Sequence, residues 1–362
     1  VAAVCGCYSQ LSPEEAAKNG AKVIFGTGNH EGFLEALESA VDGGEEKTEI
    51  DDPFRRKRYE ELPAGAVSGR TRAMLKIQDG CVNFCTYCII PYTRGRLRSL
   101  PIDKAEEETR QLASEGYREL VLTGIEIASY GADLPEKADL ADVVCAIAEN
   151  AGEMRIRLGS LEPTVITESF CERLAGSGKL CRHFHLSLQS GCDRTLKAMN
   201  RKYDTQRFFE ATERLRRYFP GCGLTCDLIV GFPGESEEDF SETLAFIRKC
   251  AFSDMHIFPY SRRPGTPADQ MPQQCTHAVK AKRAAMAQEV CEEMHGDFLK
   301  SAVGETLPVL FETEADGRSV GHSDTYVLVS AEGSKLRNQL LPVKITETDG
   351  QMLSGYITGG EK

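Results

Sequence analysis

The feature that most constrains the fold is a strand-then-helix pattern that repeats from Ala73 to about Ser261. Short apolar, β-prone runs alternate there with helical stretches such as Lys104–Ser114, Asp142–Asn150 and Glu237–Cys250. This alternation predicts βαβ units and a parallel sheet. Six units are too few for a closed eight-stranded barrel, so we expect an α/β fold with a partial, open (β/α)6 barrel. The predicted strands are Met74–Ile77, Leu120–Thr123, Arg155–Leu158, His183–Leu188, Leu224–Val230 and Met255–Phe258.

The residues that follow these strands are the first candidates for a functional site. In open or closed α/β sheets, ligands bind at the carboxyl ends of the strands. Polar, small and sulfur-bearing residues gather at these positions, which predicts a site along that edge. They are Cys81, Gly124, Ser160, Gln189, Gly231 and Tyr260.

Three cysteines after the first of these strands have a spacing that suits a metal cluster. Cys81, Cys85 and Cys88 form C-x3-C-x2-C, and the next cysteine is Cys145. Three close thiolates suit a cubane iron–sulfur cluster and leave one iron without a protein ligand. Structural zinc needs four ligands, usually as two pairs, and no second pair lies close to this run. The alternative is three buried cysteines that pack as small hydrophobic residues.

Smaller regions flank the predicted barrel, which we place at residues 71–300. Residues 1–50 alternate strand and helix and predict part of an α/β domain; because the chain starts inside an apparent strand without Met, we expect a fragment. Residues 51–70 predict a linker, whose run Arg55-Arg56-Lys57-Arg58 is typical of a solvated surface, with RNA contact as the alternative. Residues 304–362 predict a small antiparallel β-barrel. Its strands are Leu307–Glu312, Tyr326–Val329, Leu341–Thr346 and Leu353–Ile357.

Charge and hydropathy limit the classes of partner. The net charge is −12, and no apolar run approaches the ~18 residues of a membrane span, so we expect a cytoplasmic enzyme without a membrane partner. From Glu305 to Lys362, five Lys or Arg face nine Asp or Glu, so the small barrel has a net charge of −4 and is a poor RNA site by charge alone. A better candidate for phosphate contact lies just after the cysteine run: Arg94, Arg96 and Arg98.

The cysteine run and five later motifs resemble the radical S-adenosylmethionine (SAM) methylthiotransferases. The resemblance covers essentially the whole chain, and the joint presence of the motifs is highly specific. Lys76–Cys81 and Arg155–Pro163 are most similar to the members that modify threonylcarbamoyladenosine in tRNA. The other matching motifs are Cys88–Gly95, Leu122–Gly124, His185–Gly191, Asp227–Glu235 and Phe258–Ser261 with Gly265–Pro267.

The resemblance implies a radical-SAM core with a [4Fe-4S] cluster on Cys81, Cys85 and Cys88, shielded from water by Phe84 and Tyr87. It implies SAM as the second cofactor, with a TRAM-like barrel at the C-terminus. Gly124 and Glu126 occupy the place of the motif for the SAM amino group, and Gly231 that of the adenine-side motif. Ser160, Glu162 and Gln189 would make polar contacts with ribose or methionine, and Arg201 would pair with the SAM carboxylate.

The N-terminal part resembles the family's auxiliary-cluster domain. Cys7 matches the third cysteine of that cluster, whose other two ligands would lie before Val1, so a second cluster is expected only in a full-length chain. Two residues depart from the family pattern: Val82 replaces a commonly polar residue, and Leu100 replaces a commonly basic one.

The sequence therefore predicts a tRNA methylthiotransferase that modifies C2 of N6-threonylcarbamoyladenosine next to the anticodon. By resemblance, one SAM supplies the methyl group and a second yields a 5′-deoxyadenosyl radical. We expect tRNA and an electron donor such as flavodoxin or ferredoxin as partners. One alternative is the same chemistry on isopentenyladenosine tRNA or a ribosomal protein. Another is a non-catalytic, metal-stabilised RNA-binding protein.

Overall fold

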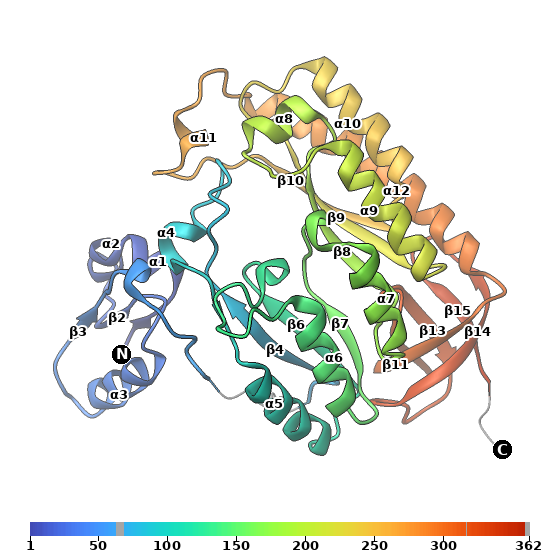
Figure 1. The fold of residues 1–362 in the computed structure, drawn as a ribbon, viewed down its shortest axis with the longest axis horizontal. Coiled ribbons are helices and arrows are strands. Elements are labelled where there is room, and N and C mark those ends of the chain that lie inside the picture. The colour runs from blue at the N-terminus through green and yellow to red at the C-terminus, as the bar shows by residue number, and fades with distance from the viewer. Residues whose placement is uncertain (63–68, 316, 359–362) are drawn as a thin grey trace.

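The chain forms an N-terminal α/β layer, a central strand-and-helix body and a C-terminal barrel (Figure 1). The computed structural model describes residues 1–62, 69–315 and 317–358, so part of the predicted linker, residues 63–68, lies outside the described residues. Among the described helices, none is both long and apolar enough to cross a membrane.

The central body confirms the predicted partial barrel. Its six parallel strands lie in two sheets, with the orders β5-β4-β6-β7 and β8-β9-β10. Bridges from Ile156 to Leu180 and from Leu161 to Leu186 connect the two sheets between β7 and β8. The short β5 (Arg98–Ser99) pairs antiparallel with β4. The six strands are β4 (Arg72–Asp79), β6 (Glu119–Gly124), β7 (Arg155–Leu158), β8 (His183–Gln189), β9 (Gly223–Val230) and β10 (Asp254–Pro259).

The strands bury one face against helices, as their sequence alternation requires. In β8, Phe184 and Leu186 belong to the main hydrophobic core, whereas His183 and His185 lie on the opposite face with Thr225 of β9. Each buried Leu or Phe side chain contributes roughly 1.5–3 kcal/mol. The helices of the body are α5 (Ile102–Ser114), α6 (Leu140–Asn150), α7 (Glu168–Gly176), α8 (Asp193–Ala198), α9 (Thr205–Tyr218), α10 (Glu237–Cys250) and α11 (Pro267–Gln270).

The N-terminal layer is a parallel sheet of β1 (Ala3–Val4), β2 (Val23–Phe25) and β3 (Lys47–Glu49). Its helices are α1 (Cys7–Leu11), α2 (Pro13–Lys18) and α3 (His30–Val41). The sequence did not predict β3, because Lys-Thr-Glu is polar and the strand is an exposed edge. The hydroxyl of Thr27 donates to the carbonyl of Thr93 at 2.5 Å, which attaches this layer to α4 (Ile90–Arg94) of the central body.

The C-terminal part is a closed five-stranded barrel in the order β11-β12-β13-β15-β14. The long helix α12 (His277–Ala302) leads into it, and Leu299 at its end joins the barrel core. All neighbouring pairs are antiparallel except β13 with β15. The predicted strand Tyr326–Val329 was placed too early, because Tyr326 has a φ of 69° and ends a turn. The strands are β11 (Thr306–Ala315), β12 (Arg318–Ser323), β13 (Leu328–Glu332), β14 (Leu340–Thr348) and β15 (Leu353–Ile357).

Buried arginines join the barrel to the amino-terminal ends of the core strands. Arg155 donates to the carbonyls of Pro308 and His322 at 2.9 Å, and Arg157 donates to those of Ser323 and Asp324 at 3.1 Å. Between them, the fully buried Glu119 accepts hydrogen bonds from both guanidinium groups at 2.6–3.0 Å. The ring of Tyr326 also stacks on His183, with centroids 4.8 Å apart.

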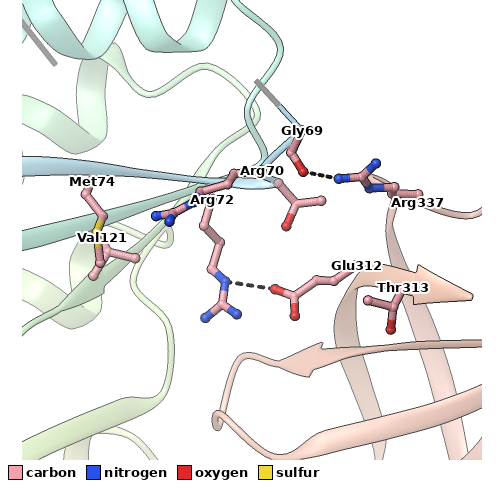
Figure 2. A pocket seen from close by; sticks show the side chains of 9 residues that line it. Gly69, Arg70, Arg72, Met74, Val121, Glu312, Thr313 and Arg337 are labelled. Carbon is pink, nitrogen blue, oxygen red and sulfur yellow. Dashed lines mark hydrogen bonds and ion pairs between the residues drawn. The ribbon is translucent and has the colours of Figure 1, made fainter. Parts of the chain in front are cut away.

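A cavity of about 470 Å³ lies beside this contact, between the start of β4 and β11 (Figure 2). Arg72 pairs with Glu312 at 2.8 Å across it, and Arg337 donates to the carbonyl of Gly69. The lining residues thus connect the two domains from both sides.

Candidate active site

The cysteine loop connects β4 to α4 at the carboxyl end of the sheet. Gly80 has a φ of 76°, and a Cβ there would meet the carbonyl oxygen of Arg96 at 1.9 Å, so only glycine fits. The backbone N–H of Cys81 donates to the carbonyl of Gly95 at 3.0 Å, and that of Thr86 donates to Met199 at 3.0 Å. The loop is therefore held from both sides by backbone hydrogen bonds.

The three thiols of this loop share one site, and each has a hydrogen-bond donor. The backbone N–H of Asn83 lies 3.5 Å from Sγ of Cys81, and Nη1 of Arg201 lies 3.2 Å from Sγ of Cys85. Burial raises the pKa of Cys81 to about 12 and also raises that of Cys88, which the backbone N–H of Ile90 offsets in part. All three are free thiols. The three thiols fit an iron–sulfur cluster. N–H donors stabilise the thiolate form that binds iron, and metal binding displaces the thiol protons.

A buried polar network lies beside the thiols. The side-chain amide of Asn83 donates to Oε2 of Glu126 at 3.2 Å and to Oε1 of Glu162 at 3.1 Å. Nη2 of Arg201 pairs with the same Glu162 oxygen at 2.8 Å. Burial, and then the Glu162 charge, raise the pKa of Glu126 to about 8. Two close carboxylates facing one arginine favour a further cation, such as an ammonium group.

Arg201 is bound to protein groups on every side of its guanidinium. Besides Glu162 and Cys85, its Nε donates to the hydroxyl of Tyr203 at 2.9 Å. Tyr203 in turn donates to the carbonyl of Leu188 at 3.0 Å. The predicted contact of Arg201 with the SAM carboxylate therefore stays a prediction, and the contacts seen here orient a cysteine and a glutamate.

The other predicted cofactor residues lie at strand ends along the same edge. A Cβ on Gly124 would meet the carbonyl oxygen of Gln78 at 2.9 Å, and Gly231 has a φ of 71° with its N–H 2.7 Å from Oε2 of Glu235. Gln189 ends β8 with a φ of 66°, and Ser160 is exposed just after β7.

A cavity of about 250 Å³ joins the cysteine loop to the last two core strands. Tyr87 forms the wall next to the thiols, and Gln189 comes from the end of β8. The remaining lining residues are Asp227, Ile229, Phe258, Pro259, Tyr260, Ser261 and Arg263. Its position between the cysteine loop and the ends of β8, β9 and β10 suits a small nucleoside-bearing ligand.

Tyr87 and Phe84 differ in their surroundings. The Tyr87 side chain is only partly accessible, and its hydroxyl lies 3.5 Å from Arg201. Phe84 is 38% exposed, has a φ of 48° and stacks on Phe54, with centroids 6.5 Å apart. Its ring faces Phe54 and Tyr92 with part of it open to solvent.

Cys7 lies at the start of α1, on the side of the N-terminal layer that faces the cysteine loop. Its thiol is half-buried and close enough to Cys88 to contribute, after burial and Cys85, to the raised pKa of Cys88. Cys5 is exposed. The structure thus brings one predicted auxiliary ligand near the three-cysteine site.

The three arginines after the cysteine loop have different environments. Arg98 is buried and donates to the carbonyls of Arg94 and Arg96 at 2.9 and 2.8 Å. Arg94 and Arg98 both lie 3.5 Å from Oδ2 of Asp79. Arg96 is the exposed member of the three. The sequence predicts one patch of three arginines, because their spacing does not show which of them is buried.

Sequence reasoning missed Asn83 and Tyr203, which complete the network around Glu162 and Arg201. Asn83 lies inside the C-x3-C spacer, so its position within the motif was the one available signal. Tyr203 is two residues after Arg201, and nothing in its local pattern marks it.

Comparison with known proteins identifies the superfamily of the central body. Residues 75–247 match the family model described as the Radical SAM superfamily. Among solved structures, the cobalamin-dependent S-adenosylmethionine radical enzyme OxsB, with aqua-cobalamin and S-adenosylmethionine bound, is similar in fold, with a TM-score of 0.53 and 15% identity over 80% of this chain and 43% of that one. The central body is therefore a radical-SAM core.

Curated relatives define the family more narrowly. The chain is 37% identical over 353 residues to threonylcarbamoyladenosine tRNA methylthiotransferase MtaB of Bacillus subtilis (strain 168), covering 95% of this chain and 78% of that protein. It is 35% identical over 369 residues to the tRNA-2-methylthio-N(6)-dimethylallyladenosine synthase of Pelotomaculum thermopropionicum, covering 98% and 81%. The chain belongs to the radical-SAM methylthiotransferase family, whose cofactors are a [4Fe-4S] cluster and SAM.

Proposed function

We propose that this protein adds a methylthio group to C2 of N6-threonylcarbamoyladenosine next to the anticodon of tRNA. The observation that carries the proposal is the convergence of three thiols with the Asn83–Glu126–Glu162–Arg201 network at the carboxyl ends of the core strands. The substrate follows the relatives named for threonylcarbamoyladenosine, from Bacillus subtilis, Thermotoga maritima and Aquifex aeolicus, at 33–37% identity.

Cys81, Cys85 and Cys88 would hold the SAM-binding cluster. When bound, the cluster supplies the electron that cleaves SAM to methionine and a 5′-deoxyadenosyl radical. The chain's own residues stabilise the thiolate form and limit water: Arg201 and the backbone N–H of Asn83 donate to sulfur, and Tyr87 covers the site.

SAM would lie along the strand ends. The acidic pair Glu126 and Glu162 suits its ammonium group, together with a backbone carbonyl at the close-approach position Gly124. Ser160 and Gln189 are placed for ribose or methionine oxygens, and Gly231 for the adenine side. Arg201 holds Glu162 in position. Its contact with the carboxylate of SAM remains a prediction.

The reaction also needs a second cluster, an electron donor and tRNA. Cys7 would be one ligand of the auxiliary cluster. An electron donor such as flavodoxin or ferredoxin would reduce the core cluster in the cytoplasm. Arg96, exposed beside the cysteine loop, is the arginine of the predicted patch that is free to contact a tRNA phosphate. Arg94 and Arg98 support its loop through Asp79.

Mass spectrometry of tRNA nucleosides from cells with and without the gene tests the function. We expect the 2-methylthio form of threonylcarbamoyladenosine to disappear on deletion, with the unmodified nucleoside accumulating. Loss of the 2-methylthio form of dimethylallyladenosine instead would assign the second substrate named among the relatives. A nucleoside profile unchanged by deletion would refute an RNA substrate.

A further inference from the structure

A layer of polar side chains crosses the inner face of the last three core strands. His185 of β8, Asp227 of β9 and His256 of β10 have ligand atoms that all lie within 4.8 Å of one another. Nε2 of His185 and Nδ1 of His256 each lie 3.3 Å from a different oxygen of Asp227. The two imidazole rings face each other, with centroids 5.2 Å apart. The SAM-binding network described above uses none of the three residues.

A hydrogen-bond chain fixes how this layer presents its atoms. The hydroxyl of Thr225 lies 2.8 Å from Nδ1 of His185 and 3.0 Å from Nε2 of His183. Because a hydroxyl has one proton, Thr225 donates to one ring and accepts from the other. If it donates to His185, then Nε2–H of His185 points at Asp227. Nδ1 of His256 pairs with the other oxygen of the same carboxylate, so its Nε2 is the acceptor and has no partner inside the layer.

Exposure rises across the layer toward the open edge of the barrel. The side chains of His185, Asp227 and His256 are 13%, 24% and 61% exposed, although all three lie within strands. Phe258, two residues further along β10, is 50% exposed. Asp227 also lines the 250 Å³ cavity that reaches Tyr87 of the cysteine loop. A ligand entering from the β10 side would therefore meet His256 first and still lie near the cofactor.

We propose that His185, Asp227 and His256 bind the N6 substituent of the target adenosine and select a polar one. This inference rests on the proposed function and deepens it. A threonylcarbamoyl group carries urea N–H groups and a hydroxyl, which can donate to the carboxylate of Asp227 and to the outer nitrogen, Nε2, of His256. A dimethylallyl group has no polar atom and would leave those groups desolvated and unpaired. Sites built on hydrogen bonds reject analogues that lack them by large factors.

The test measures deuterium transfer into 5′-deoxyadenosine from two anticodon stem-loops, each deuterated at C2 of the target adenosine. One stem-loop carries the threonylcarbamoyl group and the other the dimethylallyl group; dithionite is the reductant. We expect the unaltered enzyme to favour the first at least ~100-fold. His256→Phe keeps a ring but removes the polar atoms, so the rate on the first stem-loop should fall about 100-fold and the preference should shrink below about tenfold. Asp227→Asn is a second variant with nearly unchanged shape.

Iron content and RNA-independent cleavage of SAM should stay the same in both variants, which separates a substrate role from misfolding. The matched control is His277→Phe, because His277 is exposed at the start of α12, outside the barrel. An undiminished preference in His256→Phe and Asp227→Asn, or an equal loss on both stem-loops, overturns the inference. An unaltered enzyme that takes deuterium from the dimethylallyl stem-loop alone refutes the proposed function itself.

Discussion

Glu119 offers the most quantitative test of how the C-terminal barrel is fixed to the core. Its carboxylate is fully buried and accepts three hydrogen bonds from Arg155 and Arg157. Burial alone would raise its pKa, but Arg157 and then Arg155 lower it from 4.5 to about 2. At 1.36 kcal/mol per pKa unit, the ionised carboxylate stabilises the folded state by ~3 kcal/mol at neutral pH.

Replacing Glu119 with Gln keeps the shape and removes the charge. We expect the free energy of unfolding at pH 7 to fall by about 3 kcal/mol, which is in the range for breaking a buried ion pair. Because the folded pKa lies below the unfolded one, the stabilisation is complete above pH 4.5 and is lost as the pH falls toward 2. The difference between the two proteins should therefore shrink below pH 4.5.

Urea unfolding, followed by circular dichroism from pH 7 down to the lowest pH at which both proteins fold, measures this difference. The matched control is Glu153→Gln, whose carboxylate pairs with Arg118 at the surface and is 81% exposed. That variant should lose at most about 1 kcal/mol. A loss below about 1 kcal/mol for Glu119→Gln, or a loss that does not depend on pH, would refute the reasoning.

Three further predictions concern the cysteine loop and the arginines that follow it. Cys85→Ala should abolish the cluster chromophore and SAM cleavage after anaerobic reconstitution, as measured by iron analysis and 5′-deoxyadenosine formation; unchanged iron content would contradict the assignment of the ligands. Arg96→Gln should reduce the slope of log affinity against log salt for tRNA by about one. Arg98→Gln, by contrast, should lower the unfolding free energy, since Arg98 is buried on two backbone carbonyls. An unaltered salt slope in Arg96→Gln would place the RNA on another face.

The regular body of the fold could be predicted because its strands and helices carry complete apolar patterns. Arg155–Leu158, Glu237–Cys250 and Leu353–Ile357 have the same bounds in sequence and structure. The strands that were missed, β3, β5 and β12, are polar or small in composition and are held by pairing with neighbours. Their stability comes from tertiary contacts that no local pattern records.

The parts of the site made by residues close together in the sequence could be predicted. The parts made by residues that only strand pairing brings together could not. The three cysteines lie within eight residues, so their spacing alone indicated a cluster. His185 and His256 are 71 positions apart along the chain, and only the registers of β8, β9 and β10 bring them onto Asp227. Burial was equally invisible: Arg96 and Arg98 look alike in sequence, yet one is exposed and the other is enclosed by backbone carbonyls.

The contact between the C-terminal barrel and the starts of the core strands limits how ligands enter and leave the core. Arg155, Arg157 and Tyr326 cover that end of the core, and the carbonyl of Thr325 lies against Gly223 at the start of β9. The interior of the core is thus closed at this end, and it is open at the carboxyl ends of the strands and along the exposed edge of β10. Neither nucleotide nor spent cofactor can leave past the C-terminal barrel, so both have to be exchanged on the side of the strand ends and β10.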